Sequence, residues 1–347
     1  MVGWYGFFTI LSGFVAANFT ALLAVRVLTG AGEAASMPAV SGGLWKWVPR
    51  EQRGLVQGVL HAFARVGAAI TIPLTVAALL AYGIAGPFVA FGIGTLVVAV
   101  LWIAIFRDGA ARPAAGAQPK LDTRAAWHNI LRSRSMWALC IADFCYFYTL
   151  NIYLTWLPTF LVDSRHFSLL KVGIFGALPF IGGAFGGIIG GWICDTLGHR
   201  TGNMRLWRRL VPTIGMVCSV ALSLPAAYST NQTSTIILFT ASFFMLDATI
   251  SVFWAIAMDI GGERSSTAVG WMNTWASFGA IVSPLVFGFL VQYAHSWTLP
   301  FIVASVLMLI GAAVVWLIDP DERLGAPRAR NTTTTAAAAE AALGTPA

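Results

Sequence analysis

Charged side chains are scarce in this sequence: Asp, Glu, Lys and Arg together make up 10% of its 347 residues, while hydrophobic residues make up 58%. The mean hydropathy is +0.76. A soluble domain of this length would not tolerate so apolar a composition on its surface. The composition therefore predicts a protein that crosses a lipid bilayer several times.

Motifs of metal centres and common enzymes are also missing. The four cysteines lie within or at the ends of apolar stretches, with no CxxC spacing and no histidine placed as a second metal ligand. The sequence holds no H-E-x-x-H, no G-x-S-x-G and no phosphate-binding glycine loop. We therefore expect no metal, no cofactor and no enzymatic activity.

Ten apolar segments are long enough to span the bilayer as helices, which predicts an all-α polytopic fold. The first segment is short. The ten are Trp4 to Asn18, Ala21 to Trp45, Gly54 to Tyr82, Pro87 to Phe106, Met136 to Val162, Leu169 to Ile193, Leu210 to Tyr228, Thr235 to Met258, Thr267 to Tyr293 and Leu299 to Ile318.

Basic residues gather in alternate connections between these segments, at residues 46–53, 107–134, 200–209 and 264, and in the C-terminal tail. The connections on the other side hold only Arg165 and Lys171. The positive-inside rule then places both termini and the long linker in the cytoplasm, with the helices in the cell membrane. The net charge of +7 therefore reflects topology, and we expect no nucleic-acid partner.

An internal repeat predicts two related halves. When Pro49 to Ile70 is laid over Gly261 to Val282, Glu51 meets Glu263 and two glycines also match, at a constant offset of 212 residues. Many transporters consist of two such halves with the substrate site between them. We expect an N-terminal bundle (residues 1–106), a cytoplasmic linker (107–135), a C-terminal bundle (136–318) and a disordered cytoplasmic tail (319–347). The offset also predicts that two helices are absent before Met1, leaving ten of twelve.

Two ionisable residues, Arg26 and Glu33, interrupt the second apolar segment. They are two helical turns apart on one stripe, with about 10 Å between them along the axis. A charge at the centre of a bilayer helix costs at least about 2.5 to 3.5 kcal/mol, so such residues usually face protein or an aqueous cavity. We interpret Arg26 as a substrate contact and Glu33 as a proton-coupling acid. The alternative is a structural charge satisfied between helices.

The repeat also pairs His61 with Asn273 and Arg65 with Ser277, which predicts that all four line one cavity. Arg65 lies about 18 Å along the helix from the loop residue Arg53, near mid-membrane. A guanidinium fits a carboxylate, so Arg65 and Arg26 together predict an anionic substrate. The alternative role for Arg65 is a packing charge paired with Glu33 or Asp143.

Other polar residues in the second half are weaker candidates. Tyr146, Asn151 and Tyr153 in the seventh helix of the expected fold could hydrogen-bond a substrate, or could satisfy helix packing instead. Asp247 could be a second protonatable site or a partner in a helix–helix hydrogen bond. Asp259 borders a loop with Glu263 and Arg264 and is expected to take part in a cytoplasmic gate.

Several segments resemble a known family. The loop GGWICDTLGHR is similar to the G-x-x-x-D-x-x-G-x-[RK] signature of the major facilitator superfamily, with Gly191, Asp195, Gly198 and Arg200 in the expected places. RVLTGAGEAASMP, YLTWLPTFL and WAIAMDIGGERSSTAVGWMN resemble its anion:cation symporter branch. This resemblance implies two rocking bundles.

The resemblance also implies residue roles. Arg26 would position the anion, Glu33 would take up the proton, and Asn273 would hydrogen-bond the substrate. Asp195, Gly198 and Arg200 would govern gating.

The predicted function is therefore transport of a small organic anion by proton symport with alternating access, in a protein expected to be monomeric. The expected substrate is a sugar acid of the hexuronate, aldonate or aldarate type. One alternative is exchange or facilitated transport of another carboxylate, such as an aromatic acid. An alternative of another class is a non-transporting membrane sensor or scaffold, or an inactive fragment.

Overall fold

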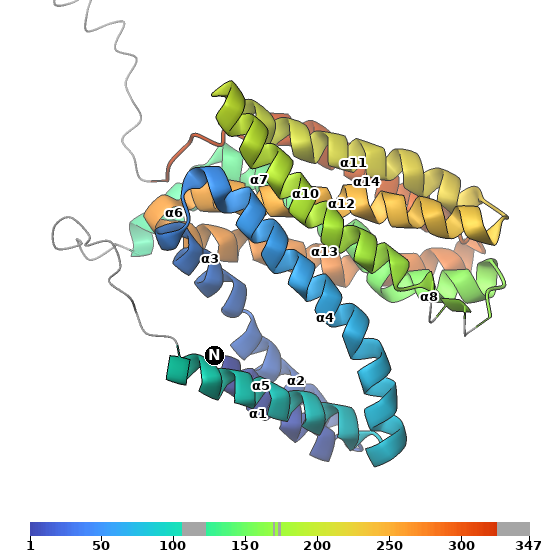
Figure 1. The fold of residues 1–347 in the computed structure, drawn as a ribbon. Helices are drawn as coiled ribbons and strands as arrows, with labels where there is room; N and C mark the ends of the chain where they lie inside the picture. Colours follow the sequence, from blue (N-terminus) through green and yellow to red (C-terminus); the bar gives the residue numbers. More distant parts are fainter. Residues whose placement is uncertain (106–122, 169–170, 173–174, 325–347) are drawn as a thin grey trace, which may run out of the picture.

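The computed structural model describes residues 1–105, 123–168, 171–172 and 175–324, and this part of the chain is helical without strands (Figure 1). Its helices are α1 (Val2–Phe14), α2 (Phe19–Glu33), α3 (Ser36–Trp47), α4 (Arg53–Tyr82), α5 (Ala85–Ile105), α6 (Thr123–Arg132), α7 (Arg134–Asn151), α8 (Leu157–Thr159), α10 (Leu178–Thr201), α11 (Met204–Tyr228), α12 (Gln232–Gly261), α13 (Ser265–Ala294) and α14 (Leu299–Val314). The 3-10 turns are η1 (Arg50–Gln52), η4 (Gly262–Arg264) and η5 (Val315–Leu317), and the π turns are η2 (Ile152–Trp156) and η3 (Phe160–Ser164).

Prolines explain two departures from the expected segments. The second apolar segment is divided into α2 and α3, because Pro38 has no N–H to continue the helix across this point. The fifth segment runs without interruption from Arg134 to Ser164, but it changes to π turns on either side of Pro158. The missing N–H of Pro38 thus accompanies a break between two helices, whereas that of Pro158 accompanies wider π turns in a continuous helix.

The predicted segment Leu169 to Ile193 is divided in the structure, because a turn at Gly176 and Ala177 separates the helical residues Lys171, Val172 and Phe175 from the long helix that follows. α10 begins at Leu178, with Pro179 in its first turn, and continues to Thr201. Gly202 then ends the helix in the left-handed conformation, with φ of 66°. The signature residues Asp195, Gly198 and Arg200 therefore lie in the last turns of a helix, and the interpretation of this stretch as a loop was wrong.

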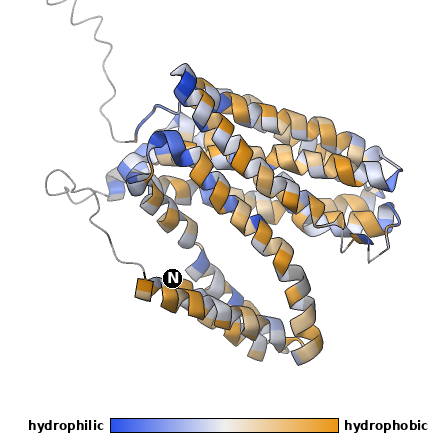
Figure 2. Cartoon of the chain, viewed as in Figure 1, coloured by the Kyte–Doolittle hydropathy of each residue, from blue (hydrophilic) through white to orange (hydrophobic). Residues whose placement is uncertain are grey.

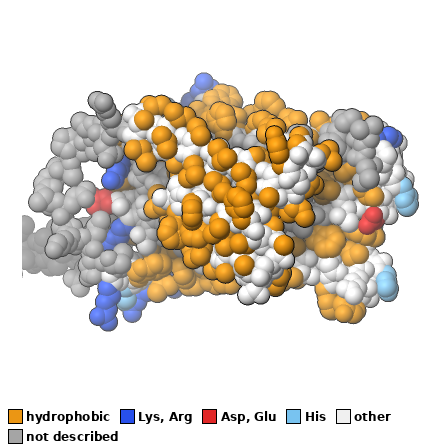
Figure 3. Space-filling view, turned by 90° about the horizontal axis from the view of Figure 1, so that it is seen from below, with side chains coloured by type: hydrophobic (Ala, Val, Ile, Leu, Met, Phe, Trp, Pro, Cys, Tyr) orange, Lys and Arg blue, Asp and Glu red, His pale blue; other side chains and the backbone are white. Residues whose placement is uncertain are grey.

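Seven helical segments of the described chain are long and apolar enough to cross a membrane, and one of them contains both α12 and α13. Hydrophobic residues cover the helices over most of their length, while hydrophilic residues gather where α3 and α10 end and α4 begins, beside α6 (Figure 2). A view of one face shows a broad apolar surface in the middle, with several Lys and Arg side chains at the left end and fewer at the right end (Figure 3).

The six long helices α7, α10, α11, α12, α13 and α14 pack into one bundle, and α1, α2 and α5 form a second layer (Figure 1). The main core lies in the bundle, where α12 is buried along most of its length. α4 joins the two parts, since it contacts α10 and α12 as well as α5. A residue on α4 can therefore pair with the second half of the chain.

Candidate functional site

A buried ion pair connects the two predicted halves through α4 and α12. Arg65 on α4 donates from Nε to Asp247 Oδ2 at 2.6 Å and from Nη2 to Asp247 Oδ1 at 3.0 Å. The Tyr146 hydroxyl on α7 donates to Asp247 Oδ1 at 2.5 Å and accepts from Arg65 Nη2 at 3.2 Å. The side chains of Arg65 and Asp247 are 12% and 1% exposed. We call Arg65, Asp247 and Tyr146 the central triad.

The central triad ends a polar stripe on α4. Arg53, Gln57, His61 and Arg65 follow one another at intervals of four residues, and so they share a helix face. Gln57 Nε2 donates to Met258 Sδ at 3.0 Å, and the His61 ring lies 5.2 Å from the Trp254 ring. His61 Nδ1 lies 2.8 Å from the carbonyl oxygen of Gln57. The whole stripe thus faces α12.

The surroundings of the central triad are apolar. The Arg65 guanidinium lies 5.5 Å from the centre of the Phe243 ring. A groove of about 390 Å³ lies between α4 and α10, and Arg65 contributes to its otherwise apolar wall. In such surroundings a buried charge is tolerated when it is paired and hydrogen-bonded. Arg65 meets this condition through Asp247, and not through the Glu33 or Asp143 that the packing alternative named.

Asp143 itself is fully buried on α7, and neither carboxylate oxygen has a hydrogen-bond partner among the described residues.

Arg26 and Glu33 lie apart from the central triad. Both are exposed on α2, and the Arg26 guanidinium lies 4.8 Å from the Phe88 ring centre on α5. Within the described residues, neither side chain forms an ion pair. The structure therefore does not bring the two predicted charges on α2 into contact with Arg65.

The remaining substrate candidates make hydrogen bonds of a structural kind. The Tyr153 hydroxyl pairs with Ser242 of α12 at 2.8 Å, deep in the bundle. Asn151 donates to the carbonyl oxygen of Phe147, and Ser277 to that of Asn273, each within its own helix. Ser277 is exposed, and Asn273 is half-buried. Of the five predicted hydrogen-bonding residues on α7, η2 and α13, Tyr146 is the one that the structure brings into the central triad.

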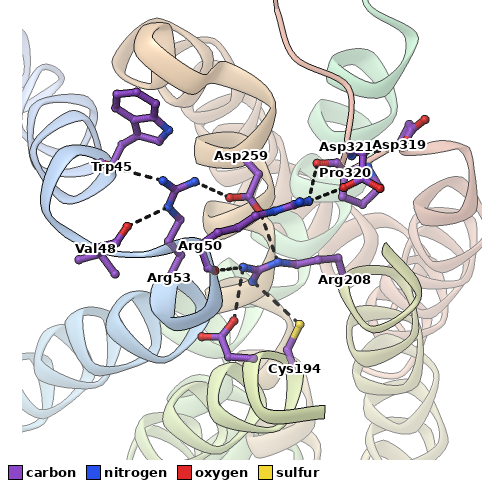
Figure 4. Close-up of polar contacts among 11 residues, drawn as sticks. Trp45, Val48, Arg50, Arg53, Cys194, Arg208, Asp259, Asp319, Pro320 and Asp321 are labelled. Carbon is purple, nitrogen blue, oxygen red and sulfur yellow. Dashed lines mark hydrogen bonds and ion pairs between the residues drawn. The ribbon is translucent and has the colours of Figure 1, made fainter. Parts of the chain in front are cut away.

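A second charged cluster holds α4, α10, α11 and α12 together at one end (Figure 4). Asp259 is its centre: Oδ1 accepts from Arg53 at 2.6 Å, and Oδ2 lies 3.4 Å from both Arg50 Nε and Arg208 Nε. Arg208, whose side chain is fully buried, also lies 3.3 Å from Asp195 Oδ1. Asp195 Oδ2 accepts from the backbone N–H of Leu55 at 2.7 Å. We call this cluster, defined by Arg50, Arg53, Asp195, Arg208 and Asp259, the charged end.

The other two signature residues lie beside this cluster. Gly198 is buried, and a Cβ there would approach Met204 Sδ to 2.6 Å. Arg200 is exposed in the last turn of α10. Asp195 is therefore the signature residue that enters the ion-pair cluster in the structure.

Residues 318–324, which follow η5, lie across the charged end, and we call them the strap. Arg50 donates to Asp321 at 2.6 Å, and Arg205 lies 3.2 Å from Asp319. Ser135 donates to Glu322 at 2.5 Å, and the Leu324 N–H donates to Ile260 at 2.9 Å. The first residues of the tail predicted to be disordered are thus fixed, while residues 325–347 lie outside the described residues.

Sequence reasoning missed Arg50, Arg53 and Arg208 as a functional group. It assigned them to topology because they lie near segment ends, and it grouped Asp259 with Glu263 and Arg264. In the structure the partners of Asp259 come from α4, η1 and α11 instead. The sequence position of Arg208 could have indicated its burial. Arg208 lies two residues before the apolar segment that begins at Leu210, close enough to belong to the same helix.

A helical membrane protein with two related halves and a buried ion pair between them has the architecture of a secondary transporter. The family model described as Major Facilitator Superfamily matches residues 1–284 and 208–346. The chain belongs to this superfamily and is a multi-pass membrane transporter, not an enzyme.

In sequence, the chain is similar to proteins named as transporters of organic anions. It is 34% identical to the Cupriavidus necator protein named "Probable sulfoacetate transporter SauU", over 93% of this chain and 80% of that protein. It is 27% identical to the Escherichia coli protein named "Probable L-galactonate transporter", over 90% of this chain and 72% of that protein. The crystal structure of the E. coli fucose:proton symporter FucP has the same fold, with a TM-score of 0.68 and 14% identity over 90% of this chain and 83% of that one.

Proposed function

We propose that this chain carries a small organic anion, with a sugar acid as the first candidate, by proton symport with alternating access. The observation that carries the proposal is Arg65, a permanent cation between the two halves whose only ionic partner among the described residues is the carboxylate of Asp247. A site built to hold one carboxylate can hold another. The names of the relatives, which refer to sulfoacetate, galactonate and hexuronate, support an anionic substrate.

A second candidate is a short sulfonated acid. The relative that is 34% identical to this chain is named for sulfoacetate, whereas the relatives named for sugar acids are 25 to 28% identical. Sulfonate and carboxylate both accept hydrogen bonds from a guanidinium. A panel that contains both substrate types distinguishes these two candidates.

Within this proposal, Arg65, Tyr146 and His61 form the inner part of the site. Asn151, Tyr153, Asn273 and Ser277 are further substrate contacts that require movement of their helices, and Arg26 is a second cation that attracts the anion. Glu33 and Asp247 are the two candidates for the proton-coupling acid. The proton and the anion are the only partners proposed besides the lipid bilayer, and the proposed state is a monomer.

We place the charged end in the cytoplasm, together with both termini, by the positive-inside rule. Asp195, Gly198 and Arg200 then belong to the cytoplasmic gate. α4 and α10 are in close contact near the charged end. The groove between them lies farther from the charged end, beside residues 59–70 of α4. This combination is expected of a transporter closed toward the cytoplasm.

Ligand binding to the purified chain tests the substrate proposal. Sugar acids, sulfoacetate and aromatic carboxylates are titrated by calorimetry into wild type, Arg65→Gln, Arg65→Lys and Arg132→Gln. Loss of a charge-assisted hydrogen bond costs about 1.5 to 3 kcal/mol, so Arg65→Gln is expected to weaken binding by at least about tenfold. Arg132, exposed at the end of α6, is the matched control and should bind as wild type does.

Arg65→Lys keeps the charge but loses the forked geometry, and it is expected to bind with intermediate affinity. Thermal unfolding of each variant shows whether it is folded. Wild-type affinity in folded Arg65→Gln would contradict the proposed role of Arg65.

A further inference from the structure

Asp247 occupies the position at Arg65 that a substrate carboxylate would need. Its two oxygens accept from Nε and Nη2 of the guanidinium, the paired geometry in which arginine binds a free carboxylate. The Tyr146 hydroxyl completes the arrangement by donating to one of the same oxygens. The anion-binding side of Arg65 is therefore already filled by a group of the protein.

We propose that Asp247 competes internally with the substrate anion, so that the anion binds Arg65 when Asp247 has taken up a proton. This assignment rests on the proposed function and names the coupling acid for it. In this step one proton forms an O–H bond with a carboxylate oxygen of Asp247, and the ion pair with Arg65 is lost. The guanidinium keeps its charge and pairs with the incoming anion. One proton therefore enters with one anionic group.

The alternative acid, Glu33, lacks this relation to a cation. It is exposed on α2, and among the described residues no ion pair joins it to an arginine. Protonation of Glu33 would therefore leave Arg65 occupied. Protonation of Asp247 would free Arg65, whose side chain is 12% exposed and lies near the middle of α4.

The competition also links binding to the relative position of the two halves. Arg65 belongs to α4 in the first half, while Asp247 and Tyr146 belong to α12 and α7 in the second. Loss of the ion pair between Arg65 and Asp247 removes a contact between the two halves. An anion bound to Arg65 can replace that contact if it also binds residues of the second half. By linkage, a proton and an anion that each favour the same state increase the affinity for one another.

Few other ionisable groups surround Asp247. α4 contributes His61 besides Arg65, and α7 contributes Asp143 one turn before Tyr146. α10 packs beside Asp247 through Gly183, without a titratable side chain at that level. Four other ionisable residues lie inside the helices that contact α12, namely Cys140, Cys145 and Tyr148 of α7 and Cys218 of α11. The rest lie in the end turns or short elements: Lys46 of α3, Arg53 and Tyr82 of α4, Arg134 of α7, Cys194, Asp195, His199 and Arg200 of α10, Arg205, Arg208, Arg209 and Tyr228 of α11, Glu263 and Arg264 of η4, and Tyr293 of α13.

The test is the pH dependence of anion affinity, with the panel member that binds wild type most tightly. If one proton enters with each anion, the dissociation constant of the wild type should rise by up to about tenfold per pH unit toward alkaline pH. In Asp247→Asn the competing charge is absent, so binding should be at least as tight as in wild type at low pH and independent of pH. Asp163→Asn removes an exposed acid outside the site and should keep the wild-type slope.

A second measurement distinguishes proton coupling by Asp247 from a purely structural role of this residue. Infrared difference spectra on anion addition should show a new protonated-carboxyl band in wild type and in Asp163→Asn, and no such band in Asp247→Asn. A pH slope that persists in folded Asp247→Asn, or one that disappears in Glu33→Gln instead, would overturn the assignment of Asp247. Absence of any anion binding by wild type would overturn the proposed function and this assignment with it.

Discussion

Single buried acids organise the charges of this protein. Asp259 holds three arginines at the charged end, and Asp247 holds one in the interior. The sequence predicted Arg65 and Asp247 as separate functional residues, but it could not pair them, because their contact joins helices 182 positions apart. Side-chain type indicates that a charge needs a partner, while tertiary packing decides which partner it meets.

At the residue scale we predict that Asp259→Asn is strongly destabilising. The change would leave the buried Arg53 and Arg208 without their shared carboxylate, and breaking a buried pair costs about 3 to 5 kcal/mol. Chemical unfolding in detergent, followed by tryptophan fluorescence, measures the difference. The exposed Asp163→Asn should change stability by less than about 0.5 kcal/mol. Equal stability of the two variants would contradict the role of Asp259 in holding the charged end together.

Whole helices were easier to predict than their ends. Apolar length predicted α4, α5, α12 and α13 to within three residues at each end, because the bilayer requires long apolar helices. α11 begins at Met204, six residues before the predicted start at Leu210. The α2–α3 break and the late start of α10 were missed, although Pro38 and Pro179 stand beside them. The substrate side chains on α13 and α2 stay predictions, since none of the hydrogen bonds or ion pairs of the central triad among the described residues involves them.

At the element scale we predict that Gly58→Ala opens the charged end. α4 and α10 meet at Gly58 and Gly187, and a Cβ on Gly58 would overlap the carbonyl oxygen of Gly187. The helices must then separate at this point. Spin labels on the two helices near the charged end should show a longer mean distance in Gly58→Ala than in wild type.

Gly67→Ala on the same helix is the matched control, since a Cβ there would meet no atom within 4 Å. It should leave the label distance unchanged and stabilise α4 by about 0.5 to 1 kcal/mol, as Ala generally does relative to Gly inside a helix. Equal label distances in Gly58→Ala and wild type would show that this close approach does not set the helix spacing.

At the scale of the whole molecule, the two halves are joined at two levels. The charged end and the strap join them at one end of the helices, and the central triad joins them near the middle of α4. Opening of a transporter toward one side requires that contacts of one level break while those of another form. The repeat in the sequence indicated two halves, but the contacts that join them follow from the folded arrangement.

Uptake into proteoliposomes tests most directly whether this chain moves an organic anion through Arg65 with a proton. Labelled sugar acid and labelled sulfoacetate are offered outside vesicles under an inward proton gradient, with wild type, Arg65→Gln and protein-free vesicles side by side. We expect wild type to accumulate one of the two above its external concentration, with loss of accumulation on adding a protonophore or in Arg65→Gln. Accumulation by Arg65→Gln equal to that of wild type would contradict this account. So would uptake by wild type that is the same with and without the proton gradient.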